Sequence, residues 1–361
     1  MAVVSTRFSV WPRWVGVVAV LATLVLGSGL LWVALQPLPV AGGASAAGPG
    51  DLVSYQRIIA LMRNGEGYYP AAHDVLVADG YGTRSVFNWR TPAWPMLLAA
   101  LPSLGWGQGL LGVLALLGVL MVYRMMRADG GVGLAAVSGL GVGLSLAGIA
   151  VPESVVFSEV AAGTLILVSV AAYGNGWRVA GIVAGIAALF LRELAVPYVV
   201  VCAVLALRER RWREAAAWGI GLAVYAGYFL WHWWMVTLQL GPMDRAYGEG
   251  WLQFGGLGFL LKAAGFNGLL SLAPGWLAAL LLPAGLLGLA AWLKGGRAAL
   301  TVVAYVLLFA AAGKPFNGYW GALFTPVMML GLGWAAVAVR EIFGRDQRDA
   351  ATLRGDSSKA R

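Results

Sequence analysis

Uncharged apolar runs recur along almost the whole of this chain, and they restrict its fold more than any other feature. The first run, residues 14–36, carries no charged side chain. It is long enough to cross a bilayer core of about 30 Å at about 1.5 Å per helical residue. Only 11% of the residues are charged, against about 25% in soluble globular proteins. Most of the surface must therefore face lipid, which predicts an integral membrane protein and excludes a soluble enzyme.

The pattern predicts an all-α polytopic membrane protein with about ten transmembrane helices. The expected spans are residues 14–36, 107–123, 132–150, 159–173, 178–191, 195–207, 214–236, 276–293, 298–312 and 321–339. A secretory signal peptide is the alternative for the first run, because the small-residue stretch 41–47 follows it. That run is longer than a signal core of about 7–15 residues, which favours an uncleaved helix.

Charge bias decides the orientation and the one doubtful boundary. Residues 178–207 could form one long helix or two helices joined at Arg192. With two helices and a cytoplasmic N-terminus, the cytoplasmic segments hold 17 of the 25 Lys and Arg residues but only 7 of the 16 acidic ones. This agrees with the positive-inside rule and places both termini in the cytoplasm. The formal net charge of +9 is thus an orientation signal and does not indicate nucleic-acid binding.

The expected domains follow from this topology. Residues 1–340 form the integral membrane domain, with residues 37–106 and 237–275 as two outer, periplasmic loops. We expect amphipathic surface helices in the first of these loops. The tail, residues 341–361, mixes both signs of charge with small polar residues and is predicted to be disordered.

Acidic residues at the outer face are the candidates for chemistry. Asp51 follows a glycine and precedes a helical pattern, which predicts a helix N-cap, and a cap position is compatible with a role as a general base held at the membrane surface. Glu153 and Glu159 lie at the outer end of the third span. They are either solvated in a turn, or they bind an acceptor hydroxyl or a divalent cation such as Mg²⁺ or Mn²⁺.

Cations are expected at the same face. Arg90 lies in the first loop, Arg192 between two apolar runs, and Lys314 between the last two spans. Together they could bind a phosphate or pyrophosphate. The alternatives are an internal Arg–Glu pair for Arg192 and a snorkelling side chain for Lys314. His73 and His232 are the only histidines, so carboxylate chemistry is more plausible than chemistry with a histidine base.

Two segments of the first loop resemble a known family. Asp51 is followed by Tyr55 and by the pair Tyr68-Tyr69, and a proline-bearing segment, residues 87–95, precedes the second span. This arrangement resembles the GT-C superfamily of membrane glycosyltransferases, in which a cytoplasmic N-terminus and one span precede an outer loop with an acidic residue. The chain departs from the family pattern in having a lone Asp51 instead of an acidic pair.

The resemblance implies a GT-C-type, inverting glycosyltransferase of the bacterial-type inner membrane. It would move a sugar from a polyprenyl-phosphate donor to a glycan, lipid or protein acceptor on the outer face. Asp51 would be the catalytic base. The substrate and its phosphate would contact Arg192, Lys314, Arg90, Tyr55 and Tyr69, and Glu153 and Glu159 would bind the acceptor or a metal.

Two other functions remain open from the sequence. Ten helices with many glycines would also suit a transporter or lipid flippase. Transporters, however, place polar residues near the bilayer midplane, whereas the ionisable residues here gather at one surface. A non-catalytic subunit of a polysaccharide assembly pathway, with merely solvated acids, is the third possibility.

Overall fold

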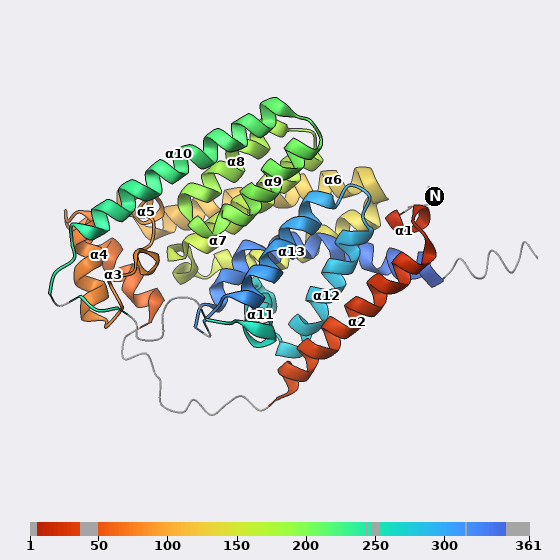
Figure 1. Ribbon diagram of the computed structural model, residues 1–361, viewed down its shortest axis with the longest axis horizontal. Helices are drawn as coiled ribbons and strands as arrows, with labels where there is room; N and C mark the ends of the chain where they lie inside the picture. The colour runs from red at the N-terminus through yellow and green to blue at the C-terminus, as the bar shows by residue number, and fades with distance from the viewer. Residues whose placement is uncertain (1–5, 37–49, 243, 247–252, 315, 344–361) are drawn as a thin grey trace, which may run out of the picture.

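The computed structural model describes residues 6–36, 50–242, 244–246, 253–314 and 316–343 (Figure 1). All regular structure in these ranges is helical. The first seven α-helices are α1 (Arg7–Val10), α2 (Arg13–Leu35), α3 (Asp51–Arg63), α4 (Tyr68–Ala78), α5 (Ala93–Ala100), α6 (Leu104–Leu146) and α7 (Ser158–Gly174). The next are α8 (Arg178–Leu191), α9 (Val196–Arg208), α10 (Trp212–Thr237), α11 (Gly256–Gly265), α12 (Gly275–Ala291), α13 (Gly296–Ala311) and α14 (Thr325–Met328).

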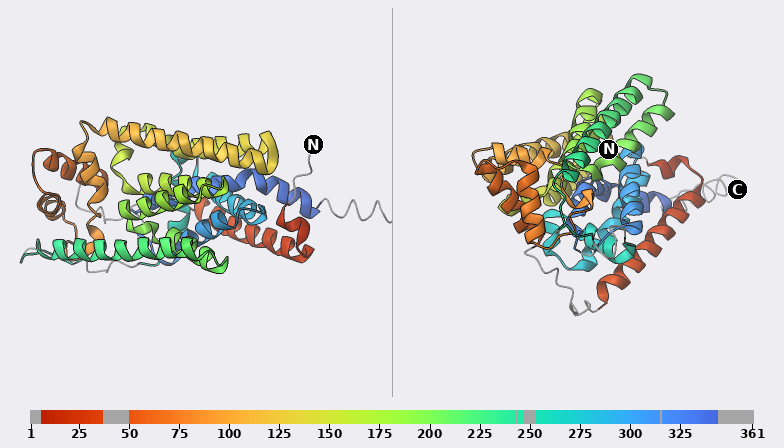
Figure 2. Two further views of the ribbon diagram at one scale, coloured as in Figure 1. Left: turned by 90° about the horizontal axis from the view of Figure 1, so that it is seen from above. Right: turned by 60° about the vertical axis from the view of Figure 1, so that its left-hand side comes forward.

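Short 3-10 segments connect these helices. They are η1 (Val86–Asn88), η2 (Ala147–Ala150), η3 (Pro152–Val156), η4 (Glu193–Ala195), η5 (Gly268–Leu272), η6 (Gly318–Leu323) and η7 (Met329–Gly331). A helical stretch continues from η7 to Phe343. Seen from above (Figure 2, left), the first half of α6 and α10 form opposite edges of the bundle, with α7, α8 and α9 between them.

The predicted spans coincide with helices, but their number as membrane spans is not established. Gly131, at φ 82° inside α6, has a conformation that glycine adopts easily, and it divides α6 at the predicted loop. α8 ends at Leu191 and α9 begins at Val196, as the two-helix interpretation requires. By length and hydropathy, three helices in the described residues could cross a membrane: Arg13–Leu35, Leu104–Ala150 and Thr325–Phe343. These apolar helices indicate an integral membrane protein.

The bundle has two distinct ends. Figure 1 shows α3, α4 and α5 together with the last turns of α10 at one end, which we call the α3–α5 end, and α1 at the other. The segments that the charge bias groups as cytoplasmic contact one another at this opposite end. The contacts are Arg7 Nη2 to the Leu293 carbonyl at 3.0 Å, Arg124 over Trp177 at 5.3 Å, Lys294 to Asp129 at 2.5 Å and Arg297 to Glu214 at 3.5 Å.

The two predicted outer loops are largely folded where the structure describes them. The first contains α3, α4 and α5, and its own small core of Ile58, Tyr69 and Trp89 packs on Val236 of α10. The second, residues 237–275, is not a loop throughout. It contains α11, whose Phe259 and other apolar side chains are buried in the main core. Four of the seven α11 side chains other than glycine are fully buried or nearly so, so burial overrides the expectation of a loop.

The final apolar segment is broken where it packs most tightly. η6, α14 and η7 divide it, and every side chain from Gly318 to Gly331 is buried. Glycines of neighbouring helices allow this contact, because a methyl group on Gly163 would lie 1.9 Å from the Ala322 carbonyl oxygen. The break brings residue 319 to the α3–α5 end. The helix continues to Phe343, so the tail begins later than predicted, and its predicted disorder concerns residues outside the described ranges.

Candidate active site

Asp51 lies at the start of α3, in a recess of the α3–α5 end. Gly50, at φ 86°, takes the N-cap position, so Asp51 is the first helical residue and not the cap itself. Its Oδ1 accepts a hydrogen bond of 2.6 Å from the Tyr81 hydroxyl, and its Oδ2 accepts one from the Tyr319 hydroxyl. The side chain is 16% exposed. The carboxylate is thus held by two phenol groups and still reaches the surface of the recess.

Arg90 connects Asp51 to a second carboxylate. Its Nη2 donates a hydrogen bond of 2.6 Å to the Tyr319 hydroxyl. The same nitrogen lies 3.9 Å from Asp51 Oδ2 and 3.9 Å from Glu159 Oε1. The guanidinium group also lies over the Tyr55 ring at 5.1 Å, a cation–π distance. The Arg90 side chain therefore places one positive charge between the two acids.

The protonation states of this cluster follow from burial and neighbouring charges. Burial raises the pKa of Tyr55 and of Tyr319 well above the usual value, and the carboxylate of Asp51 raises both further. Both phenols therefore stay protonated, and Tyr319 donates to Asp51. Burial alone would lower the pKa of Arg90, but the surrounding phenols and carboxylates outweigh it and raise that pKa well above the usual value. Arg90 is a permanent cation.

Glu159 and Arg192 form a fully buried ion pair. Arg192 Nε lies 2.8 Å from Glu159 Oε1, and Arg192 Nη1 bonds Glu193. Neither Glu159 nor Arg192 exposes any surface. Arg192 is therefore engaged in the internal Arg–Glu pair that the sequence left open as the alternative. We revise the phosphate-binding prediction for this residue, because a buried guanidinium between two acids is not accessible to a substrate.

Lys314 shares the recess with Asp51. The lining residues are Asp51, Tyr55, Tyr81, Phe87, Asn88, Arg90, Lys314, Phe316, Asn317, Tyr319 and Trp320, and they enclose about 30 Å³. The Lys314 side chain is buried, with its Nζ 5.9 Å from the Phe316 ring. Two cations, Arg90 and Lys314, thus lie beside the same carboxylate.

Three predicted site features lie elsewhere or are not found. Glu153 is exposed and lines a different cavity from Asp51. The Tyr69 hydroxyl is 3.0 Å from His232 Nδ1 and belongs to the contact between α4 and α10, so Tyr69 lies outside the Asp51 recess and its substrate role stays a prediction. Among the described residues, no group of three or more His, Cys, Asp or Glu side chains is arranged to hold a metal ion.

Two tyrosines of the site were not among the predicted residues. Tyr81 and Tyr319 bond both oxygens of Asp51, although they lie 30 and 268 positions from it in the chain. Interfacial tyrosines are common in membrane proteins, so residue type alone does not single these two out. For Tyr319, the sequence gives one indication of a place in the site: it lies in the same segment between the last two predicted spans as Lys314.

An apolar cavity of about 410 Å³ adjoins the recess. Phe87 and Trp320 line both spaces. The other side chains around the cavity come from η4, α9, α10 and the end of α13. They include Val196, Phe229 and Leu308, and among the described lining residues Glu193 alone is charged. The charged recess therefore borders a space suited to a hydrocarbon chain.

Comparison with known proteins gives one structural similarity. No family model matches the chain, and no curated protein matches it. The chain is similar to the crystal structure of ArnT from Cupriavidus metallidurans in the apo state, with a TM-score of 0.48 and 17% sequence identity. The alignment covers 92% of this chain and 62% of the ArnT chain, so this chain spans less than two thirds of ArnT. The roles of the site residues therefore rest on the geometry described above.

Proposed function

We propose that this protein is a membrane glycosyltransferase that moves a sugar from a polyprenyl-phosphate donor to an acceptor hydroxyl. The reaction would take place at the α3–α5 end, on the outer face of a bacterial-type inner membrane. One observation carries the proposal: the hydrogen-bonded carboxylate of Asp51 shares a recess with the cations of Arg90 and Lys314. A base and a phosphate-binding pair are the two elements that this reaction needs side by side.

Asp51 acts as the general base. It takes the proton of the acceptor hydroxyl as that oxygen forms a bond to the anomeric carbon from the side opposite the phosphate. The bond between that carbon and the phosphate oxygen breaks, its electron pair stays on the phosphate, and the configuration is inverted. The acceptor must come within about 3 Å of the carboxylate. Tyr81 and Tyr319 fix the orientation of the carboxylate through their hydrogen bonds.

Arg90 and Lys314 stabilise the leaving phosphate. Negative charge grows on the phosphate oxygen in the transition state, and fixed cations beside it lower the barrier. Arg90 takes the place that the sequence gave to Arg192. Arg192 has a positioning role instead, because it holds Glu159 at 3.9 Å from Arg90 Nη2.

The polyprenyl tail occupies the adjoining apolar cavity of about 410 Å³. Because Phe87 and Trp320 line both spaces, a tail in this cavity would place its phosphate at the recess. Hydrocarbon binding here needs no polar partner.

A divalent cation is not part of this proposal. Arg90 Nη2 already lies 3.9 Å from both Asp51 and Glu159, so the guanidinium supplies positive charge where Mg²⁺ or Mn²⁺ would bind. Turnover should therefore persist after treatment with EDTA. Loss of turnover with EDTA and recovery with Mg²⁺ or Mn²⁺ would show that the predicted metal site exists.

One observation favours the transporter alternative. The segment Gly318 to Gly331 is a broken helix buried in the bundle, and broken helices form the binding sites of many transporters. In this chain the break places Tyr319 against Asp51 at one end of the bundle. Counterflow of a labelled sugar in proteoliposomes, without breakdown of a lipid-linked donor, would support the transporter instead.

The test is turnover by Asp51→Asn. Full-length protein in nanodiscs would be given a panel of polyprenyl-phosphate-linked radioactive sugars with a membrane lipid extract as acceptor. Since a positioned base contributes about 10²–10⁴-fold, we expect the variant to lose at least about 100-fold in rate while its thermal unfolding stays unchanged. Unchanged turnover in a folded variant would overturn the proposal.

A further inference from the structure

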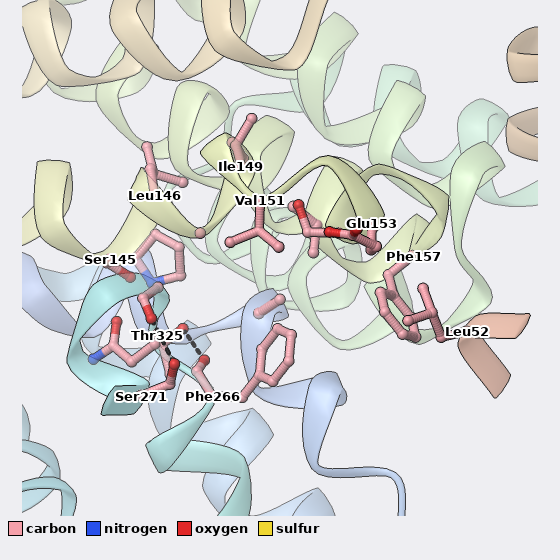
Figure 3. Close-up of a pocket in the computed structure, with 17 residues that line it drawn as sticks. Leu52, Ser145, Leu146, Ile149, Val151, Glu153, Phe157, Phe266, Ser271 and Thr325 are labelled. Carbon is pink, nitrogen blue, oxygen red and sulfur yellow. Dashed lines mark hydrogen bonds between the residues drawn. The ribbon is translucent and has the colours of Figure 1, made fainter. Parts of the chain in front are cut away.

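A second cavity, of about 260 Å³, lies behind the wall of the Asp51 recess. Figure 3 shows its lining, which includes Leu52 from α3, Phe157 at the start of α7, Phe266 after α11 and Thr325 of α14. Leu52 follows Asp51 in the chain. The Phe157 ring lies 4.9 Å from the ring of Tyr319, which bonds Asp51. One layer of side chains therefore separates this cavity from the proposed base.

Three polar atoms at this cavity have no hydrogen-bond partner within the part of the chain that the structure describes. They are Ser145 Oγ, Ser154 Oγ and Asn267 Oδ1, all without accessible surface of their own. Asn267 is 2% exposed, and among the described residues its amide nitrogen donates to the sulfur of Met329, at 3.5 Å. An unsatisfied buried polar group costs about 1–3 kcal/mol. Three such groups around one cavity indicate a ligand that carries hydroxyl groups.

The charge of the lining restricts the ligand further. Glu153 is the one charged residue among those that line the cavity. Arg90 and Lys314 both line the Asp51 recess and not this cavity. A phosphate or carboxylate would meet no cation here and would be repelled by Glu153. Most of the other lining side chains are apolar, with Leu146, Ile149 and Val151 among them, and Ser271 and Thr325 add two hydroxyl groups (Figure 3).

We infer that this cavity binds the acceptor, and that the acceptor is an uncharged amphiphile with hydroxyl groups, such as a neutral glycolipid or lipid alcohol. This inference rests on the proposed function and assigns the acceptor class that the proposal leaves open. The donor, with its phosphate, then lies on the cationic side of Asp51 and the neutral acceptor on the other. The acceptor hydroxyl reaches Asp51 when the Phe157 ring moves aside.

The test is a photolabelling experiment that needs no turnover. The full chain in phosphatidylcholine nanodiscs would be exposed to a long-chain alkyl glucoside with a diazirine in its tail, and separately to the alkyl phosphate of the same length. We expect the glucoside to label peptides spanning 145–157 and 266–271. We expect the phosphate to label the same peptides at least about tenfold less, a difference as large as the loss of one hydrogen bond to a charged group would cause.

Variants locate the binding. Asn267→Leu removes the unpartnered amide, and we expect glucoside labelling to fall about three- to tenfold. Ser145→Val and Ser138→Val form a matched pair on one face of α6. Ser145 lines the cavity, whereas Ser138 Oγ donates to the Leu330 carbonyl at 3.3 Å and does not line it. Labelling should fall in the first variant and stay constant in the second.

Each other outcome overturns the inference. Equal labelling by the phosphate probe would contradict the inference that the acceptor is uncharged. Labelling of other peptides, or labelling unchanged in both Asn267→Leu and Ser145→Val, would show that the acceptor does not bind in this cavity. A failure here combined with loss of turnover in Asp51→Asn would leave the transferase proposal standing, and the reverse result would leave the cavity without that function.

Discussion

Asp51 and Asp129 lie at opposite ends of the bundle, and each carboxylate is held by an aromatic donor near a cation. Asp51 accepts from two tyrosine hydroxyls, and its nearest guanidinium nitrogen is 3.9 Å away. Asp129 accepts from Trp292 Nε1 at 2.9 Å and from the ammonium group of Lys294 at 2.5 Å. A direct ion pair neutralises Asp129, whereas Asp51 keeps its charge beside a recess. The same residue type is structural at one end and suited to proton transfer at the other.

Buried glutamates repeat this contrast. At the opposite end, Glu214 pairs with Arg211 at 2.9 Å and Arg297 at 3.5 Å. At the α3–α5 end, Glu159 pairs with Arg192 and lies 3.9 Å from Arg90. Of these four arginines, only Arg90 also lines the recess that holds Asp51. Burial and ion pairing therefore do not distinguish the proposed active-site cluster from the ion pairs at the opposite end, whereas the adjoining recess does.

The largest effect is expected on stability, from Arg192→Met. Removing one partner of the buried pair leaves Glu159 with only the more distant Arg90, at 3.9 Å, as a nearby cation, which should lower the free energy of unfolding by about 3–5 kcal/mol. Lys294→Met is the matched change at the other end. Its side chain is 66% exposed, so the loss should stay below about 1 kcal/mol. Thermal unfolding in detergent measures both.

A second change checks the cause. Arg192→Met combined with Glu159→Gln should recover part of the lost stability, because the fully buried charge of Glu159 is gone while Glu193 still lacks its partner. If the double variant is as unstable as Arg192→Met alone, the pair does not act through charge.

A smaller effect is expected on turnover, from Tyr319→Phe. This change removes a hydrogen bond to the Asp51 carboxylate and the acceptor for Arg90 Nη2, so the rate should fall about ten- to hundredfold, as for a hydrogen bond to a charged group. Tyr173→Phe is the counterpart at the opposite end, where it removes a hydroxyl that accepts a hydrogen bond of 3.2 Å from Trp218 Nε1. Equal losses of turnover in the two variants would erase the distinction between the ends.

The smallest effect is a pH dependence at Asp244, which ties α4 to the connection after α10. Burial tends to raise the pKa of this carboxyl, but hydrogen bonds from the Gly241 N–H, Thr83 and His73 outweigh it and lower the pKa below the usual 3.8. A lowered folded-state pKa stabilises the protein above pH 3.8, and this stabilisation is lost as the pH falls through the lowered value.

The size of this effect should be about 1 kcal/mol. Unfolding temperatures measured across acid pH should fall less steeply for Asp244→Asn than for the wild type. Asp74→Asn is the control, because its carboxylate is 74% exposed. A wild-type slope matched by Asp244→Asn would contradict the assignment.

The sequence predicted the helices and part of the site. Apolar runs located the helices, and the split at Arg192 followed from charge bias. Asp51 and Arg90 were predicted together because they share the first loop. The sequence left the partner of Arg192 open, because Glu159 lies 33 positions away and the local pattern does not favour it over the adjacent Glu193. Tyr81, Tyr319 and the buried position of α11 depend on tertiary packing, for which the local pattern holds no signal.

The most direct test of the central claim compares Asp51→Asn with Asp129→Asn in the same preparation. Transfer of sugar from the lipid-linked donor and the unfolding temperature would be measured for both. The contrast between the two ends predicts that Asp51→Asn loses at least about 100-fold in turnover and keeps its unfolding temperature, whereas Asp129→Asn keeps turnover and unfolds at a lower temperature. Full turnover in Asp51→Asn, or equal loss in both variants, would contradict the claim that Asp51 is the base.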